Sequence, residues 1–484
     1  MTVRRAPVVA AIVLSMFMSA MEATVVATAM PTVVADLHGI ELYGWVTAIY
    51  MLASTVTIPL WGKLADLRGR RPVMLAGMAL FLLGSVLSGA AGGMVALIAF
   101  RGIQGAGAGA LQPVALTIIG DLFTIEERGR MQGIFGAVWG LAAISGPLLG
   151  GLIVHALGWR WVFFVNVPFG LLSAALLVAF HRDPARTTAP GPLDVAGAAL
   201  LTLTVLALLA GVGGRSPALT LPLAALGLAA FLAVERRASE PMIPLTLFRD
   251  PVIATASVAG ALMGSVMMAS LTYLPLHVQA VLRGTPTAAG TAVAPMLIGW
   301  PVASAVAGRL LARTSYRVLV RTGLVAVGVA TFALWRLLAA GAGTSAMRAV
   351  MLLFGAGMGF ANTALIVMVQ ERAGFAMRGV ATASTMFFRT IGGAVAVGAL
   401  GALLARRVAG DVPESLLREM LGPEHGAGVD PRVLQAAGVH LSGAMVTVFG
   451  AIAVLGVLAA LTGPFFPAVE RRSSTAPAPV PAEG

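Results

Sequence analysis

The sequence contains no cysteine and is poor in charge: only 11% of its 484 residues are charged, against about a quarter in ordinary soluble domains. The absence of thiols excludes disulfide bridges, thiolate catalysis and cysteine-ligated metal centres. The scarcity of charge, together with a hydrophobic content of 58%, excludes an ordinary soluble globular protein. We therefore expect the lipid bilayer to be the main partner of the chain.

The positive charge of the chain does not indicate nucleic-acid binding. Lys63 is the only lysine, so nearly all of the positive charge behind the net +12 is arginine. Nucleic-acid binding needs a basic face or stripe, but these arginines stand in short turns between apolar runs. The six histidines are scattered without metal-ligand spacing. We expect no nucleic acid and no metal, and the sequence has no histidine and acid cluster that would indicate a membrane enzyme.

Fourteen apolar segments are long enough to cross a bilayer as helices, which takes about 20 residues each. They predict an all-α polytopic membrane protein. The seventh and eighth segments are short and are separated only by residues 213–217. The segments lie at roughly 8–34, 44–65, 73–92, 95–120, 131–155, 162–181, 193–212, 218–234, 252–277, 287–308, 318–339, 348–369, 379–404 and 438–464.

The placement of arginine predicts the orientation of these segments. If the N-terminus is inside, most arginines fall on the cytoplasmic side, as the positive-inside rule requires. An even number of spans then places both termini in the cytoplasm, and the cell inner (cytoplasmic) membrane is the expected location. The first apolar stretch runs past Glu22 and is too long for the apolar core of a signal peptide, so we expect it to be retained.

An internal repeat divides the chain. Residues 62–64 (GKL) are echoed by residues 308–310 (GRL), and Arg128-Gly129 is echoed by Arg378-Gly379. Similar halves at such a distance are typical of transporters built from parallel repeats. The predicted division is an N-terminal six-helix bundle (1–186), two inserted transmembrane helices (187–248), a C-terminal six-helix bundle (249–470) with an extracellular loop (405–437), and a disordered cytoplasmic tail (471–484).

Five motifs resemble, in order and spacing, those of the major facilitator superfamily, and in particular of its 14-helix drug/proton antiporters. The stretch WGKLADLRGRRP at 61–72 is similar to the loop between helices two and three of that superfamily. The resemblance covers nearly the whole chain and implies the major facilitator fold, with two six-helix bundles and two extra helices between them. The other motifs are MEATVV at 21–26 with Ala29-Met30-Pro31, RGIQGAG at 101–107, SGPLLGG at 145–151, and residues 159–168 at the start of the sixth helix.

Glu22 stands near the middle of the first apolar segment. A charge at the bilayer centre costs about 2.5–3.5 kcal/mol on insertion scales, so it is rarely retained without a use. One interpretation is a structural contact with another helix; the sharper hypothesis is that Glu22 takes up and releases a proton in alternation with substrate. Arg101, in the fourth segment, also needs an acidic or carbonyl partner in the membrane. The resemblance implies a role for Arg101 in proton transfer.

Residues 61–75 form a basic turn around a single acid, Asp66. The simpler interpretation is that this turn only sets the membrane orientation. The alternative hypothesis, which follows the resemblance, is that Asp66 binds the amides and the positive dipole end of a helix that begins near Gly379, and so holds an inner gate shut. The glycines of the stretch allow close approach and a tight turn. The predicted gating residues are Gly62, Asp66, Gly69, Arg70 and Arg71.

The SGPLLGG stretch places a proline among several glycines. Proline inside a helix removes a hydrogen bond and kinks the helix, and the glycines would let the bend press against a neighbouring helix. Packing alone could explain this pattern; the resemblance implies an exporter rather than an importer. The predicted antiporter-motif residues are Gly140, Gly146, Pro147, Gly150 and Gly151. The predicted substrate-cavity residues are Thr24, Gln104, Gln112, Asn362 and Arg389.

The sequence thus predicts a proton-coupled secondary active exporter, a drug/proton antiporter, of small lipophilic or cationic compounds. It would work by alternating access and would be no enzyme. The alternative is a proton-coupled importer or exporter of a specific metabolite on the same fold. Neither function needs a cofactor, because the proton gradient supplies the energy, and the sequence contains no P-loop motif. The sequence does not indicate an oligomeric state.

Overall fold

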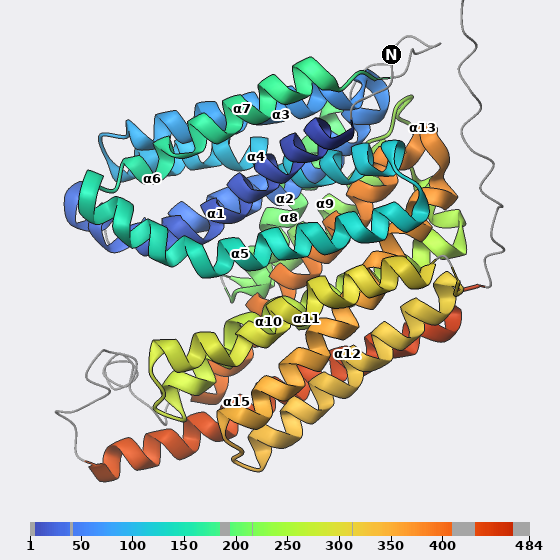
Figure 1. The fold of residues 1–484 in the computed structure, drawn as a ribbon. Coiled ribbons are helices and arrows are strands. Elements are labelled where there is room, and N and C mark those ends of the chain that lie inside the picture. The colour runs from blue at the N-terminus through green and yellow to red at the C-terminus, as the bar shows by residue number, and fades with distance from the viewer. Residues whose placement is uncertain are drawn as a thin grey trace, which may run out of the picture.

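The computed structural model describes residues 5–38, 42–183, 194–214, 216–311, 313–408 and 431–467. Within these ranges all regular secondary structure is helical, which confirms the predicted all-α class. The helices fall into two bundles, an N-terminal bundle drawn in blue to teal and a C-terminal bundle drawn in yellow to red (Figure 1).

The N-terminal bundle consists of α1 (Arg5–Leu37), α2 (Tyr43–Arg68), α3 (Arg70–Gly89), α4 (Met94–Leu122), α5 (Ile125–Leu157), the short α6 (Trp161–Phe164) and α7 (Asn166–Phe180). Glycines let these helices pack tightly. On α4, a Cβ on Gly105 or Gly107 would meet backbone atoms of Tyr50 on α2 or of Phe81 on α3. Small residues at such positions allow membrane helices to approach each other closely.

The C-terminal bundle consists of α10 (Pro251–Ala280), α11 (Pro286–Leu311), α12 (Tyr316–Ala339), α13 (Thr344–Val408) and α15 (Pro431–Thr462), with a short 3-10 helix, η3, at Gly463–Phe465. α13 is 65 residues long, but its backbone leaves the helical region at Gly374 (φ 66°, ψ −177°). Glycine adopts this positive φ without a steric penalty. We call the parts of α13 before and after Gly374 its first and second arms.

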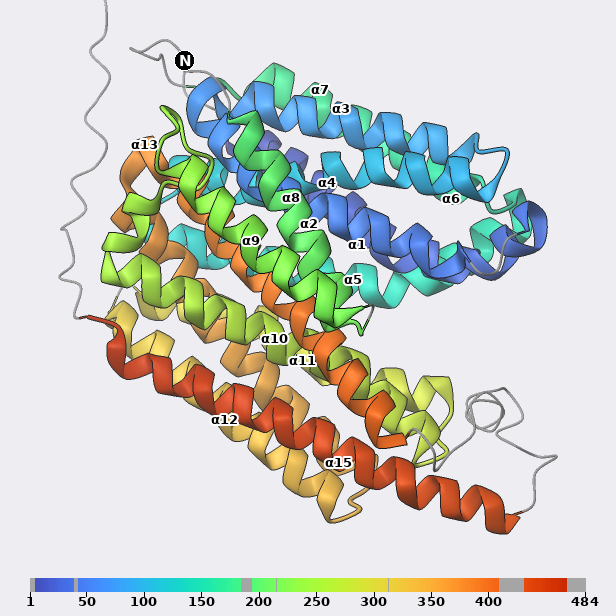
Figure 2. The same cartoon turned by 180° about the vertical axis from the view of Figure 1, so that it is seen from behind.

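Two helices lie between the bundles in sequence, α8 (Val195–Val212) and α9 (Pro217–Glu235), and a short 3-10 helix, η2 (Leu245–Arg249), follows them. α8 and α9 pack against each other at the side of the molecule, and α8 contacts both α2 and α13 (Figure 2). The ammonium group of Lys63 on α2 lies 2.6 Å from a carboxylate oxygen of Glu240. The single lysine of the chain therefore ties α2 to the segment that follows α9.

Twelve helices among the described residues are long and apolar enough to cross a membrane, so the chain is a multi-pass membrane protein. α13 is counted once among them, although it has two arms. α5 is not counted, although it is 33 residues long. Ten of the predicted apolar segments lie entirely within a helix, and those at 348–369 and 379–404 lie in the two arms of α13. The other four overlap helices but were drawn with different bounds: 73–92, 162–181, 193–212 and 438–464.

The predicted extracellular loop was too long at both ends. α13 continues to Val408 and α15 begins at Pro431, so residues 405–408 and 431–437 are helical. Arg406 and Arg407 stabilise the last turn of α13, because their positive charges lie at the negative end of the helix dipole. At the start of α15, proline fits the first helical position, where no hydrogen-bonding N–H is needed. The rest of the loop and the predicted tail at 471–484 lie outside the described residues.

The two bundles touch at one end of the molecule and spread apart toward the other (Figure 1). α2 packs along α13, and α5 packs along α11. The end where they meet holds Arg5, Asp66, Asp121 and Gly379, and we call it the closed end. The described chain begins and ends there (Figure 1).

Candidate functional site

The two lone charges predicted in the membrane pair with each other. Arg101 on α4 donates from Nη1 to Oε1 of Glu22 on α1. Both residues are buried, with 1% of Arg101 and 2% of Glu22 exposed. The guanidinium also lies 4.2 Å from the centroid of the Tyr50 ring and donates to the carbonyl of Val46 at 3.3 Å. The ion pair thus joins α1 to α4, and α2 covers it.

The second oxygen of the Glu22 carboxylate has a donor that the sequence did not reveal. Asn166, the first residue of α7, donates from Nδ2 to Glu22 Oε2 at 2.6 Å and to the Ser85 hydroxyl at 3.0 Å. Gln104 accepts from Arg101 Nη1 at 2.7 Å and donates to Ser85 at 3.2 Å. Gln104, which was predicted to line the substrate cavity, is fully buried and takes part in this network.

The charges in this network depend on each other. A buried ion pair is stable only while both charges are present, because removing one leaves the other uncompensated. Loss of the negative charge on Glu22 would remove its ion pair with Arg101 and weaken the hydrogen bond that it accepts from Asn166. A change of charge on one carboxylate would therefore be felt on α1, α4 and α7.

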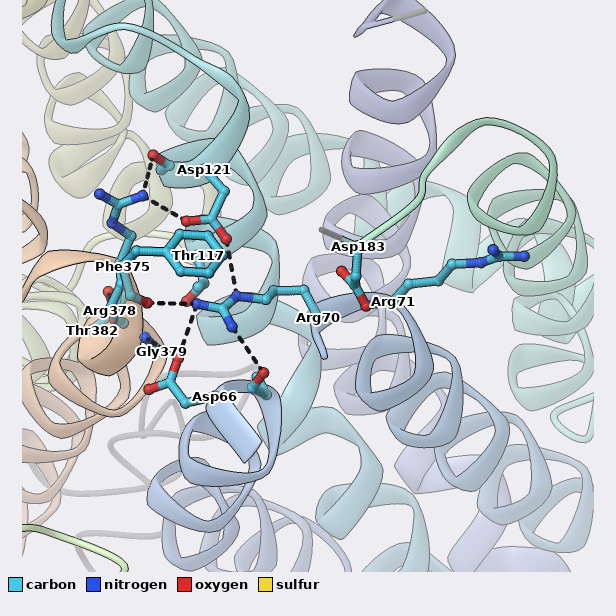
Figure 3. Close-up of polar contacts among 12 residues, drawn as sticks. Asp66, Arg70, Arg71, Thr117, Asp121, Asp183, Phe375, Arg378, Gly379 and Thr382 are labelled. Carbon is cyan, nitrogen blue, oxygen red and sulfur yellow. Dashed lines mark hydrogen bonds and ion pairs between the residues drawn. The ribbon is translucent and has the colours of Figure 1, made fainter. Parts of the chain in front are cut away.

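At the closed end, Asp66 on α2 bridges the two bundles. Its carboxylate accepts from the backbone N–H of Gly379 at 3.0 Å and of Val380 at 2.7 Å. Figure 3 shows Asp66 beside Gly379. These amides lie near the start of the second arm of α13, where unpaired N–H groups and the helix dipole favour an anion. The contact that the sequence predicted for Asp66 is present.

Arg70 and Asp121 extend the bridge. Arg70 lies 3.1 Å from Asp66 Oδ1, donates to Asp121 Oδ2 at 2.9 Å and donates to the carbonyl of Phe375 at 2.9 Å. Arg378 on α13 donates to the other oxygen of Asp121 at 2.6 Å (Figure 3). From the sequence alone, Asp121 reads as a solvated or capping residue. That reading is wrong, because the end of α4 lies between α3 and α13.

Arg71 does not join this bridge, although it was predicted to gate. Its side chain points away from the other bundle (Figure 3), and it donates to the carbonyl of Val178 on α7 at 2.8 Å. Its backbone N–H donates to Asp183 at 3.0 Å. Burial raises the pKa of Asp183, but the His181 ring, 3.4 Å away, and the hydrogen bond from the backbone N–H of Arg71 hold the pKa below its usual value. Arg71 thus braces α3 against its own bundle.

The repeated glycines of one half face those of the other half. A Cβ on Gly62 would meet Ala383 and the carbonyl oxygen of Gly379, the oxygen at 2.9 Å. In the same way, a Cβ on Gly129 of α5 would meet the backbone of Gly308 on α11. Ala312, which stands at the place of Asp66 in the repeat, lies outside the described residues. The two seams between the bundles therefore use equivalent stretches of the repeat.

Gly69 makes the turn between α2 and α3. Its φ of +102° lies in the region that glycine adopts freely. Its N–H donates to the carbonyl of Ala65 at 3.2 Å and so closes α2. This places Arg70 at the start of α3, facing Asp66, as the predicted tight turn requires.

Further polar contacts join the bundles at the closed end. Arg128 on α5 lies 2.6 Å from Glu371 on α13. Gln370 donates to the carbonyl of Leu116 on α4 at 3.1 Å. The inter-bundle hydrogen bonds and ion pairs that the described residues form all lie toward this end.

The glycines of the predicted antiporter motif face different neighbours. A Cβ on Gly140 would lie 3.3 Å from the carbonyl oxygen of Leu297 on α11, whereas one on Gly150 would lie 3.2 Å from that of Val25 on α1. A Cβ on Gly151 would meet nothing within 4 Å. These glycines therefore do not all press against the same helix: Gly140 faces α11 and Gly150 faces α1. Gly146 is buried, and the side chain of Pro147 lies outside the described residues.

Of the remaining predicted cavity residues, the structure brings two into contact. Asn362 and Arg389, on the two arms of α13, are joined by a hydrogen bond of 2.7 Å from Arg389 Nη1 to Asn362 Oδ1. Gln112 is partly buried on α4. The side chain of Thr24 lies outside the described residues. In the described ranges, no three histidine or acidic residues come together as a metal site would require.

Comparisons with known proteins place this geometry in a family. A scan against protein families matches residues 12–397 to the Major Facilitator Superfamily. The chain belongs to the major facilitator superfamily. It is therefore a membrane transporter and not an enzyme, as the motifs predicted.

Two relatives of this transporter have names that refer to multidrug transport or resistance. It is 35% identical over 413 residues to the multidrug transporter protein MdtP of Bacillus subtilis (strain 168), covering 84% of this chain and 76% of the relative. It is 36% identical over 399 residues to multidrug resistance protein 3 of the same strain, covering 80% of this chain and 77% of the relative. Among solved structures, the proton:xylose symporter XylE aligns with a TM-score of 0.64 over 96% of each chain at 16% identity. The last likeness is one of fold.

Proposed function

We propose that this transporter is a proton-coupled exporter of small lipophilic compounds, a drug/proton antiporter that works by alternating access. The observation that carries the proposal is the buried pair of Glu22 and Arg101, which gives one titratable carboxylate a fixed partner inside the membrane. The multidrug transporters among the relatives support export of drug-like compounds. The sequence also allows cationic substrates.

The proposed cycle uses both ends of the molecule. We infer that the closed end faces the cytoplasm, that both termini lie there, and that the protein resides in the cytoplasmic membrane. A proton from outside would neutralise Glu22 and release Arg101. The bridge of Asp66, Arg70 and Asp121 would then part, so that the proton leaves inward and substrate enters from the cytoplasm.

We also propose that the chain crosses the membrane fourteen times. The count of twelve candidate spans takes α13 once and omits α5. The two arms of α13 are each long enough to cross, and α5 has 33 residues, about 50 Å of helix. With these, the helices divide into two bundles of six and the inserted pair α8 and α9.

The energy of one proton is sufficient for useful export. A proton moving down about 100 mV releases roughly 2.3 kcal/mol. At about 1.4 kcal/mol per tenfold ratio, exchange of one proton for one neutral molecule supports a substrate gradient of about 50-fold.

Transport into inside-out membrane vesicles tests the proposal. Acidifying the vesicle lumen should drive uptake of a lipophilic drug by the wild type, and a protonophore should stop it. Glu22→Gln should abolish this pH-driven uptake because the side chain can no longer exchange a proton. Glu127→Gln, which changes a carboxylate that caps α5 at the surface, is the matched control and should transport normally.

Two outcomes would count against the proposal. Full pH-driven uptake by Glu22→Gln would remove Glu22 from the coupling. Proton-driven movement only out of inside-out vesicles would instead identify an importer, the metabolite-transport alternative.

A further inference from the structure

Arg389 is a second intramembrane cation, and its position is central. It lies ten residues after Gly379 in the second arm of α13, about 15 Å along the helix. That is close to the middle of a hydrocarbon core of about 30 Å. The residue is partly buried, and its backbone and Cγ pack against Gly264 of α10, where a side chain would collide with them.

Among the described residues, the one side chain that hydrogen-bonds to the guanidinium is neutral. Arg389 Nη1 donates to the amide oxygen of Asn362 at 2.7 Å. None of the ion pairs among the described residues includes Arg389. Arg101 in the other bundle differs, because its charge is matched by Glu22.

The described helices of the C-terminal bundle contain no acid that could pair with Arg389. Between residues 251 and 408 the sequence contains a single acidic residue, Glu371. Glu371 pairs with Arg128 at the closed end, 2.6 Å away. No acid stands in residues 431–467 either. In the described part of this bundle, the charge of Arg389 is therefore uncompensated.

An uncompensated guanidinium in the membrane needs an anion. Charged residues within membrane segments almost always pair with one another or with backbone carbonyls, and they mark ligand pathways. The amide oxygen of Asn362 accepts from one N–H group of the guanidinium. The other N–H groups, which form a planar fork, remain available. That fork matches the two oxygens of a carboxylate. The bond to Asn362 fixes the orientation of the fork.

We propose that Arg389 and Asn362 form an anion subsite, and that charged substrates of this transporter carry a carboxylate or a similar anionic group. Arg389 binds that group, and Asn362 positions Arg389. A cationic substrate would meet an uncompensated positive charge in this bundle. This inference names the substrate class and rests on the proposed function only in taking the cargo to be a small lipophilic molecule.

Equilibrium binding to the purified full-length transporter tests the subsite. The probes are three lipophilic molecules of one scaffold that carry a carboxylate, a carboxamide or an amine. The wild type should bind the carboxylate probe about tenfold more tightly than the carboxamide probe, a difference of about 1.4 kcal/mol. The amine probe should bind most weakly.

Variants test which residue causes the preference for the carboxylate probe over the carboxamide probe. Arg389→Gln should abolish it while the affinity for the carboxamide probe stays within about twofold. Arg389→Lys, which keeps the charge without the fork, should keep part of the preference. Arg336→Gln is the matched control, since Arg336 lies in the last turn of α12 beside the Trp335 ring, and it should keep all of it.

Three results would overturn the subsite. The first is equal binding of the carboxylate and carboxamide probes by the wild type. This result does not depend on whether any variant folds. The second is an equal loss of both affinities in Arg389→Gln, as a purely structural arginine would give. The third is an unchanged preference in Arg389→Gln. Binding needs no proton gradient, so these results are independent of whether Glu22→Gln transports.

Discussion

At the scale of single residues, the sequence revealed the charges but not their partners. Glu22 and Arg101 could be predicted because each is a lone charge in an apolar run. Asn166 and Asp121 could not, because their roles depend on which helices meet. Asn166 bonds Glu22 from a helix 144 residues away in the chain. An uncharged amide near a helix start carries no signal by itself, since such residues commonly bond to backbone.

The hydrogen bond from Asn166 should be needed for full pH-driven transport. Asn166 donates to the Glu22 carboxylate at 2.6 Å, and a hydrogen bond to a charged group contributes about 1.5–3 kcal/mol. Because its loss weakens the network that positions Glu22, Asn166→Ala should lower the initial rate of pH-driven uptake at least about tenfold. The measurement is initial uptake by inside-out vesicles with an acidified lumen.

Ser173→Ala is the matched control for Asn166→Ala. Ser173 is also buried on α7 and donates to the carbonyl of Ala11 on α1 at 2.6 Å, so its loss removes a bond between the same helices without touching Glu22. Its rate of pH-driven uptake should match the wild type. An equal loss in both variants would mean that the packing of α7, and not the bond to Glu22, supports transport.

At the scale of helices, hydropathy predicts where the membrane segments lie but not which helix faces pack together. The contact between α5 and α11 is an example. Gly129, Gly133, Gly136 and Gly140 follow one another at helical spacing and all face α11. This spacing indicates, from the sequence alone, that the four glycines share one close-packed helix face. The sequence does not indicate which helix packs against that face. Only the last of the four was predicted as a motif residue.

The contact of Asp66 with α13 should hold the closed end shut. A carboxylate at a helix N-terminus contributes up to about 1 kcal/mol at ordinary sites, so Asp66→Asn should raise the population opened at this end about fivefold. Since the chain has no cysteine, spin labels can be placed at cysteines introduced at Arg130 and Arg309, both exposed. The distance distribution between the labels measures the population.

Asp183→Asn serves as the control for Asp66→Asn. Asp183 lies near the same turn and accepts from the Arg71 N–H, a contact within the N-terminal bundle. Its replacement should leave the distribution unchanged. If Asp66→Asn also leaves it unchanged, residues 61–75 act only as a topology signal.

At the scale of the whole molecule, the two halves repeat in sequence but differ in charge. The repeat could be predicted, whereas the way each repeated stretch faces its counterpart could not, because it depends on how the bundles dock. The N-terminal bundle holds a compensated pair, Glu22 and Arg101, and the C-terminal bundle holds the lone cation Arg389. This asymmetry is the reason why we propose proton binding in the first bundle and anion recognition in the second.

The measurement that tests the central claim most directly is proton release on substrate binding. The purified transporter in weakly buffered solution is mixed with a saturating lipophilic substrate, and the pH change is recorded. If substrate and proton compete through Glu22, the wild type should release up to about one proton per bound substrate and Glu22→Gln none. Equal release from the wild type and from Glu22→Gln, with equal substrate binding, would contradict the account.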